Sequence, residues 1–165
     1  MAIVTTIGGS TTNSYITVAE YSAYADNFGW VIGNDTAAHE DQLRRATAYI
    51  NRVYNFVGQT QYQTQSMAWP RLTTQLIEGW PINPDVVPQD IKDAEAELAF
   101  LVHGGTDLMA TVTGGSTRRT KSKAGIVETE TEYASFRETP RFVAVEGLLS
   151  PYVVFGGSQI KVMRG

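Results

Sequence analysis

The sequence predicts a mainly α protein: a small helical bundle of about four helices that carries a long irregular loop, a β-hairpin-like excursion and extended termini. Three observations lead to this prediction. Apolar residues recur at spacings of three and four along several segments, as they do on the buried face of a helix. Residues that favour helix starts and stops flank those segments. Elsewhere, Gly and Pro clusters and one stretch with a period of two interrupt the helical pattern.

The 165 residues suit a single domain, which we divide into three parts. The helical core is expected over residues 15–110 plus 140–152, a hairpin excursion over 111–139, and a C-terminal tail over 153–165. A chain of this size can bury a core without metal or disulfide support, and this one contains no cysteine. No apolar run approaches the roughly 18 residues of a membrane-spanning helix, so no membrane contact is expected.

The first predicted helix begins at Thr17. Glu20 follows three residues later, so the two side chains can satisfy free backbone N–H groups at the helix start as a capping box. Gly29 is expected to end this helix, because glycine accepts the left-handed conformation that closes many helices. Between these signals lies one apolar stripe at helical spacing, formed by Tyr21, Tyr24, Ala25 and Phe28.

Three further helices are predicted. The second covers about residues 36–54, with its acids early and its bases late, as the helix dipole prefers. The third covers residues 88–103: it begins at Pro88, whose missing N–H costs nothing at a helix start, and ends before two glycines. A short fourth helix is predicted over about residues 140–149.

Residues 55–87 show neither a helical nor a strand period, and a loop of this length suggests a functional or partner-bound segment. Within it, Trp69, Pro70 and Arg71 form a compact cluster. Trp and Arg are frequent at protein interfaces, so the cluster is a candidate contact site. The alternative is that Trp69 plugs the core beneath the loop, with Arg71 stacked or ion-paired. The sequence leaves both interpretations open.

Residues 114–133 are predicted to form a hairpin whose two arms carry opposite charge and can pair across the strands. The basic first arm holds Arg118, Arg119, Lys121 and Lys123, and the alternating second arm holds Glu128, Glu130 and Glu132. DNA contact through the basic arm is the alternative. The acids nearly cancel the bases, however, and no aromatic platform for base stacking is interleaved. We therefore favour a hairpin that pairs with itself or contacts protein.

No pattern in the sequence indicates catalysis, a cofactor or a metal site. The two histidines, His39 and His103, lack the neighbouring ligands of a zinc motif and are interpreted as surface or helix-capping residues. The glycine pairs belong to no phosphate-binding motif. We therefore expect a protein that is not an enzyme and that binds no cofactor and no metal.

Charge is unevenly divided along the chain. Residues 1–110 carry 12 acidic and 5 basic residues, a net charge of −7, whereas residues 111–165 carry 5 acidic and 8 basic residues, a net charge of +3. Only the last third could therefore attract nucleic acid.

Asp90, Asp93 and Glu97 share one ridge of the third predicted helix. A solvated helix face is the ordinary interpretation of such a ridge, and acid–base chemistry is a remote one. If many copies formed a ring with this ridge inward, it would line a tunnel along which DNA slides without sticking.

Several short motifs follow one another in a particular order. They are Asn13-Ser14-Tyr15, Leu43-Arg44-Arg45-Ala46-Thr47, Tyr49-Ile50, Phe56-Val57-Gly58, Trp69-Pro70-Arg71, Val87-Pro88, Ala94-Glu95-Ala96-Glu97-Leu98-Ala99 and Leu148-Leu149-Ser150-Pro151-Tyr152. In this order the sequence resembles the head–tail adaptor (head-completion) proteins of tailed bacteriophages, which include sequences labelled DnaT-like single-stranded DNA-binding proteins. The resemblance covers nearly the whole chain.

The resemblance implies a structural virion protein without catalytic residues. Such adaptors form a ring, usually a dodecamer, beneath the portal, where they extend the DNA channel and join the capsid vertex to the tail. The implied partners are the portal protein, neighbouring adaptor subunits, a tail, stopper or nozzle protein, and genomic double-stranded DNA that passes without specific binding. The protein would lie in the virion neck after assembly in the host cytoplasm.

The resemblance also implies roles for particular residues. The C-terminal segment would bind the portal through Gln159, Ile160, Lys161, Val162, Met163 and Arg164. Within such a ring, the charges of the residues lead us to expect that the acidic ridge faces the DNA channel and that the charged hairpin faces neighbouring subunits or the tail. The alternative function is a single-stranded DNA-binding accessory protein. Its basic arm would carry that activity, and the net charge of −7 over residues 1–110 argues against it.

Overall fold

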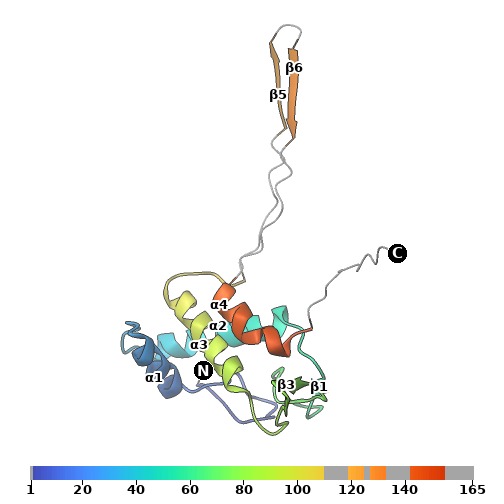
Figure 1. The fold of residues 1–165 in the computed structure, drawn as a ribbon. Coiled ribbons are helices and arrows are strands. Elements are labelled where there is room, and N and C mark those ends of the chain that lie inside the picture. Colours follow the sequence, from blue (N-terminus) through green and yellow to red (C-terminus); the bar gives the residue numbers. More distant parts are fainter. Residues whose placement is uncertain (1, 110–118, 125–126, 133–141, 155–165) are drawn as a thin grey trace, which may run out of the picture. The chain divides into compact units, whose positions relative to one another are not determined.

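The fold is built on helices, as Figure 1 shows. The computed structural model describes residues 2–109, 119–124, 127–132 and 142–154. In chain order the helices are α1 (Val18–Phe28), α2 (Thr36–Val53), α3 (Gln89–His103), α4 (Val143–Leu149) and a short 3₁₀ helix, η1 (Ser150–Tyr152). The predicted mainly α fold class is confirmed, and the helices follow in the predicted order.

The helix ends follow local signals. Thr17 caps α1: its Oγ1 accepts a hydrogen bond from the Glu20 backbone N–H at 3.2 Å, and its own backbone N–H donates to Glu20 Oε2 at 2.7 Å. Gly29 closes α1 in the left-handed conformation, with φ at 68°. Two predicted starts were slightly wrong, because Pro88 is the cap of α3 and not its first residue, and α4 begins only at Val143.

The core lies around α3, which packs against both α2 and α4, while α1 contacts α2 and α3. Each helix buries one apolar face, as the spacing of apolar residues predicted. The largest wholly buried apolar side chains of these helices are Tyr21, Leu43, Ile50, Ile91, Leu98, Val145 and Leu149.

Two short hairpins order the long loop between α2 and α3. β1 (Gln59–Thr60) pairs antiparallel with β2 (Arg71–Leu72), and β3 (Leu76–Ile77) pairs antiparallel with β4 (Trp80–Pro81). The sequence showed no strand pattern over residues 55–87. Strands of two residues are too short for a period of two to stand out, which explains the difference.

β5 (Arg119–Ala124) and β6 (Val127–Glu132) form the predicted charged hairpin. The register pairs Arg119 with Glu132, Lys121 with Glu130 and Lys123 with Glu128. Residues opposite one another in an antiparallel pair share a face of the sheet, so each basic position lies across from an acidic one, as predicted. Arg118, the remaining base of this arm, lies outside the described residues.

The chain divides into two compact units. The helical unit comprises residues 1–108 and 142–165, and the hairpin unit comprises residues 109–141. The segment 159–164, for which portal binding was expected, lies outside the described residues. Within the part of the chain that the structure describes, no helix is both long and apolar enough to cross a membrane.

Candidate functional site

A buried carboxylate joins the N-terminal segment to the helical core. Glu95 on α3 is wholly buried. Its Oε1 accepts hydrogen bonds from Ser14 Oγ at 2.7 Å and from Thr47 Oγ1 at 2.5 Å. Its Oε2 accepts from the backbone N–H groups of Tyr15 at 2.8 Å and Ile16 at 3.1 Å. Four donors from two other segments thus meet at one carboxylate, and we call this set the Glu95 latch.

Burial dominates the electrostatics of the Glu95 latch. Removal of the carboxylate from water raises the pKa of Glu95 to about 7, although the four hydrogen bonds act in the opposite direction. A carboxyl group with such a pKa is suited to proton transfer. Glu95, however, has no exposed surface, and protein donors occupy both of its oxygens. Its position therefore suits holding segments together better than reacting with a substrate.

Glu95 was not predicted as a site residue, although one signal in the sequence pointed to it. It lies four residues after Ile91 and three before Leu98, both of which are buried, so it falls on the apolar stripe of α3. A carboxylate on that stripe must be buried with it, and a buried carboxylate needs hydrogen-bond donors.

A second polar network begins at Tyr15. Its hydroxyl donates a hydrogen bond to Asn51 Oδ1 at 2.5 Å, and the same oxygen accepts from the backbone N–H of Ala68 at 3.0 Å. Burial, with the nearby charge of Glu95, raises the pKa of the Tyr15 hydroxyl far above its ordinary value, so the group remains a donor. Through Asn51, α2 therefore holds both the N-terminal segment and the long loop.

Trp69 and Arg71 lie where they anchor the long loop. Trp69 is only 1% exposed, and its ring makes edge-on contacts with Phe56 and Tyr152, with centroid distances of 5.7 and 5.6 Å. The Arg71 guanidinium donates to backbone carbonyl oxygens at 2.6–3.2 Å, those of Phe56, Val57, Gly58 and Ala68. This placement corresponds to the interpretation of the cluster as a loop anchor.

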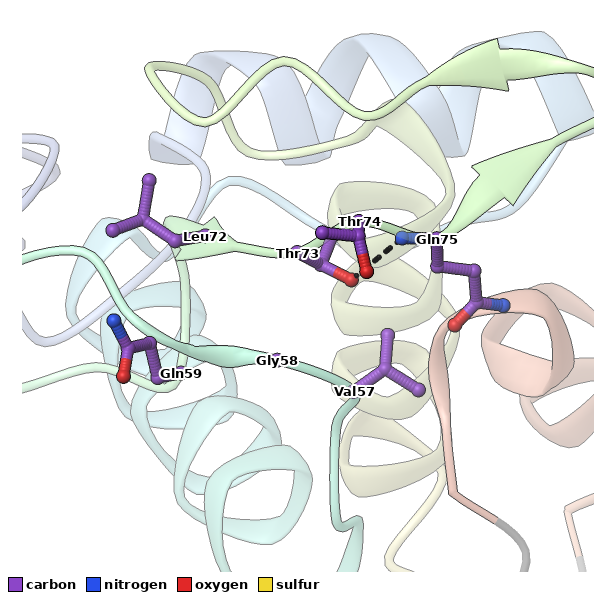
Figure 2. Close-up of a pocket in the computed structure, with 7 residues that line it drawn as sticks. All are labelled: Val57, Gly58, Gln59, Leu72, Thr73, Thr74 and Gln75. Atoms are coloured by element: carbon purple, nitrogen blue, oxygen red, sulfur yellow. Dashed lines mark hydrogen bonds between the residues drawn. The ribbon is translucent and has the colours of Figure 1, made fainter.

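An open groove lies beside β1 and β2, and Figure 2 shows the residues around it. Gly58 is required there, because its φ is 75° and a Cβ atom at this position would lie 2.1 Å from the carbonyl oxygen of Leu72. The groove has a volume of about 790 Å³ and is lined by Val57, Gly58, Gln59, Leu72, Thr73, Thr74 and Gln75. None of these side chains is charged, so the groove offers amides and hydroxyls but no acid or base.

The three acids predicted to face the DNA channel are half-buried and accept hydrogen bonds within the helical unit. The bonds join Asp90 Oδ2 to the Tyr152 hydroxyl at 2.7 Å, Asp93 Oδ1 to Gln89 Nε2 at 2.7 Å, and Glu97 Oε1 to the Tyr24 hydroxyl at 3.2 Å. Partial burial raises the pKa of Glu97, and the charge of Asp93 adds to this effect. Through their bonds to Tyr24 and Tyr152, Glu97 and Asp90 link α3 to α1 and to η1.

Most cations among the described residues of the helical unit have an assigned partner. Arg44 and Arg45 form ion pairs with acids three or four residues earlier on α2, and Lys92 pairs with Glu20 of α1 at 3.6 Å. Arg52 is exposed in the last turn of α2. Over residues 2–109 and 142–154, the basic side chains are thus dispersed among acids and do not gather into a groove for phosphates.

His39 corrects the sequence-based interpretation. It was expected at the surface, but it is 3% exposed, its Nε2 lies 3.0 Å from the carbonyl oxygen of Ile32, and its ring packs edge-on against Tyr21. The reason is that His39 lies one turn before the buried Leu43 on the same face of α2. His103 is exposed at the end of α3, as expected. Among the described residues, no group of His, Asp and Glu is arranged to hold a metal ion.

The tryptophan that faces solvent is Trp80. It lies on β4 and is 76% exposed, and Leu76 on the paired strand β3 is 58% exposed. The hairpin β3–β4 therefore exposes large apolar side chains that the sequence analysis did not single out. A tryptophan between a glycine and a proline in a long loop is the only local signal for it.

The fold and the site together define the class: a small, mainly α protein in which buried polar contacts hold an N-terminal segment and a long loop against a helical core. Over residues 1–165 the chain matches the family described as "Putative DnaT-like ssDNA binding protein", and it belongs to that family. The family label named in the sequence analysis is thereby confirmed. No curated protein and no solved structure matches the chain.

Proposed function

We propose that the protein is a non-enzymatic assembly component, a head–tail adaptor that forms a ring beneath the portal of a tailed bacteriophage and joins the capsid to the tail. The observation that carries this proposal is the hairpin β5–β6, which belongs to a compact unit distinct from the helical unit. Two antiparallel strands alone are only marginally stable in water, so a neighbouring chain that packs against them is expected.

The charges of the hairpin suit a protein neighbour better than a nucleic acid. Its register sets three basic positions opposite three acidic ones, so the positive charge is balanced across the strands. A phosphate backbone would meet little net positive charge on such a surface. A neighbouring subunit or tail protein can complement both signs at once.

The rest of the chain agrees with this role. Residues 1–110 carry a net charge of −7, which would repel DNA from a channel wall and let it slide. In the proposed ring Asp90, Asp93 and Glu97 face the channel, and residues 159–164 bind the portal. The residues that carry the adaptor resemblance, such as Glu95 and Trp69, stabilise the fold of each subunit.

The family description favours a second candidate function, single-stranded DNA binding. In that case the basic arm, with Arg118, Arg119, Lys121 and Lys123, would contact phosphates. The helical unit would add little, because ion pairs and carbonyl oxygens engage most of its cations.

Head joining in vitro tests the adaptor proposal. Portal-containing heads that lack this protein are mixed with the purified chain and with tails, and complete particles are counted by electron microscopy. Lys121→Glu sets two acids opposite each other at the Lys121–Glu130 pair and should reduce joining. The double variant Lys121→Glu, Glu130→Lys restores opposite charges and should recover it. Normal head joining by Lys121→Glu alone would show that the hairpin β5–β6 is not part of the interface.

Oligonucleotide binding tests the second candidate on the same preparations. The anisotropy of a labelled oligothymidine is followed against salt concentration, because the slope reports how many phosphates are neutralised. The adaptor proposal expects weak binding that Arg118→Ala and Arg119→Ala hardly change. Tight, salt-sensitive binding that these variants abolish would instead establish a DNA-binding protein.

A further inference from the structure

The turn of hairpin β3–β4 holds Trp80 at the surface. The register pairs Ile77 with Trp80, and only Glu78 and Gly79 lie between them. Both turn residues have positive φ, 51° for Glu78 and 87° for Gly79, as in the tight turns that join antiparallel strands. This conformation is unfavourable for glutamate, and such strain concentrates at functional positions. The strained turn therefore suggests that the exposed position of Trp80 has a function.

An apolar groove of about 320 Å³ adjoins Trp80. Its lining includes Ile77, Trp80, Ile82, Val86, Pro88 and Tyr152, which come from the hairpin, from the segment before α3 and from η1. Trp80 is 76% exposed and Val86 is 43% exposed. Apolar side chains of this size gathered at a surface often mark a site that another molecule covers.

The charged residues in the segment that supplies most of the groove's lining have one sign. Across residues 76–89 the charged residues are Glu78 and Asp85, and no Lys or Arg occurs. The next cation along the chain, Lys92, forms an ion pair with Glu20 of α1. An apolar groove among acids is complementary to an apolar side chain flanked by bases.

We propose that the groove beside Trp80 is the docking site for a segment of a partner protein in which apolar side chains are flanked by lysine or arginine. Tryptophan is one of the residue types that most often dominate the energetics of a protein interface. The groove receives the apolar anchor, and the acids attract the flanking bases and set the orientation of the segment.

Two other molecules that could occupy the groove beside Trp80, a single-stranded nucleic acid and a second copy of this chain, are less suitable than a basic partner segment. A base of single-stranded nucleic acid could stack on Trp80, but Glu78 and Asp85 would repel its phosphates. A second copy of this chain carries a basic and apolar segment at residues 159–164. The preference for a different protein rests on the proposed function, in which the portal takes that segment and a tail-side partner takes the groove.

Binding of designed peptides to the full-length chain tests the proposal by fluorescence anisotropy. In one peptide leucine alternates with lysine, in a second leucine alternates with glutamate, and in a third serine alternates with lysine. The leucine–lysine peptide should bind tightest. Trp80→Ala should weaken it about thirtyfold or more, as expected for a central interface tryptophan, and Trp80→Phe should weaken it less. Glu78→Lys should weaken it and should improve binding of the leucine–glutamate peptide.

The matched control is Val143→Ala, which shortens an apolar side chain that is 78% exposed on α4 and does not line the groove. It should leave peptide binding unchanged, and circular dichroism should show that every variant is folded. Equal binding by the serine–lysine peptide, or binding indifferent to Trp80→Ala, would overturn the proposal.

Two further outcomes would reassign the site. Displacement of the leucine–lysine peptide by oligothymidine would make the groove a nucleic-acid site. Tighter binding by a peptide of residues 156–165, with self-association of the chain that Trp80→Ala abolishes, would make it a contact between copies. The head-joining assay of the Lys121 variants leaves Trp80 unchanged, so the two proposals can fail separately.

Discussion

At the scale of single residues, Glu95 decides how the N-terminal segment is held. Two of its donors, the hydroxyls of Ser14 and Thr47, can rotate and become acceptors, whereas the two backbone N–H groups can only donate. Glutamine can therefore replace Glu95 with its amide oxygen toward the backbone and its NH₂ group toward the hydroxyls. Alanine would leave the two backbone N–H groups and the Thr47 hydroxyl without this partner and would open a cavity, whereas the Ser14 hydroxyl keeps the carbonyl oxygen of Ile16, 2.6 Å away.

We predict that Glu95→Ala lowers the free energy of unfolding by about 3 kcal/mol or more, and that Glu95→Gln lowers it far less. Urea unfolding of the full-length variants, followed by circular dichroism, provides the measurement. Equal losses for the two variants would contradict the latch, because they would show that the hydrogen bonds at this position contribute little.

The raised pKa of Glu95 predicts a pH dependence of stability. The pKa rises from 4.5 in the unfolded chain to about 7 in the fold, so between these values the folded state keeps a proton that the unfolded chain has released. The associated stability is complete below pH 4.5 and is lost as the pH rises through 7, and it amounts to on the order of 3 kcal/mol for this wholly buried group.

Comparison with Glu95→Gln isolates this contribution. The carboxyl group of Glu97 also has a raised pKa, but it is common to both proteins and cancels in the difference. The unfolding free energy of the parent minus that of the variant should fall between pH 4.5 and pH 8. A flat difference would mean that Glu95 titrates alike in the folded and unfolded chain.

At the scale of elements, the hairpins β3–β4 and β5–β6 differ in what they present. The turn of β3–β4 has its strained Glu78 and displays Trp80, whereas β5–β6 balances charges across its register. Because β5–β6 belongs to a separate compact unit, its side chains should contribute little to the unfolding of the helices.

We predict that Lys121→Glu changes the free energy of unfolding of the helical unit by less than about 0.5 kcal/mol, even where it disrupts head joining. Leu98→Ala, which empties a wholly buried position of α3, is the contrasting control and should cost about 2–5 kcal/mol. Thermal or urea unfolding followed by helical circular dichroism measures both. A loss from Lys121→Glu that approaches that of Leu98→Ala would show that the units unfold together.

At the scale of the whole molecule, the acidic and basic residues belong to different stretches of the chain. The first 110 residues carry a net charge of −7 and the remainder a net charge of +3. The first stretch therefore repels negatively charged partners, and the second attracts them. In the proposed adaptor, the acidic stretch borders DNA and accepts a basic partner segment at the Trp80 groove. The basic stretch reaches the portal and neighbouring subunits.

The sequence by itself determined the helix order, most helix ends and the pairing of a basic with an acidic arm in the charged hairpin. These features depend on neighbours within a few residues, such as Thr17 with Glu20, or on strict alternation, as in β6. The mainly α class followed, because each apolar stripe required a partner to cover it.

Only the tertiary structure decided which side chains of the long loop the core encloses and which remain exposed. Trp69 and Trp80 lie in the same loop, yet one is buried against Phe56 and Tyr152 and the other faces solvent. Glu95 accepts hydrogen bonds from residues that lie 48 to 81 positions away in the sequence. The apolar stripe of α3 signals that Glu95 is buried, but its donors come from segments far apart in the chain, so no local pattern could specify them.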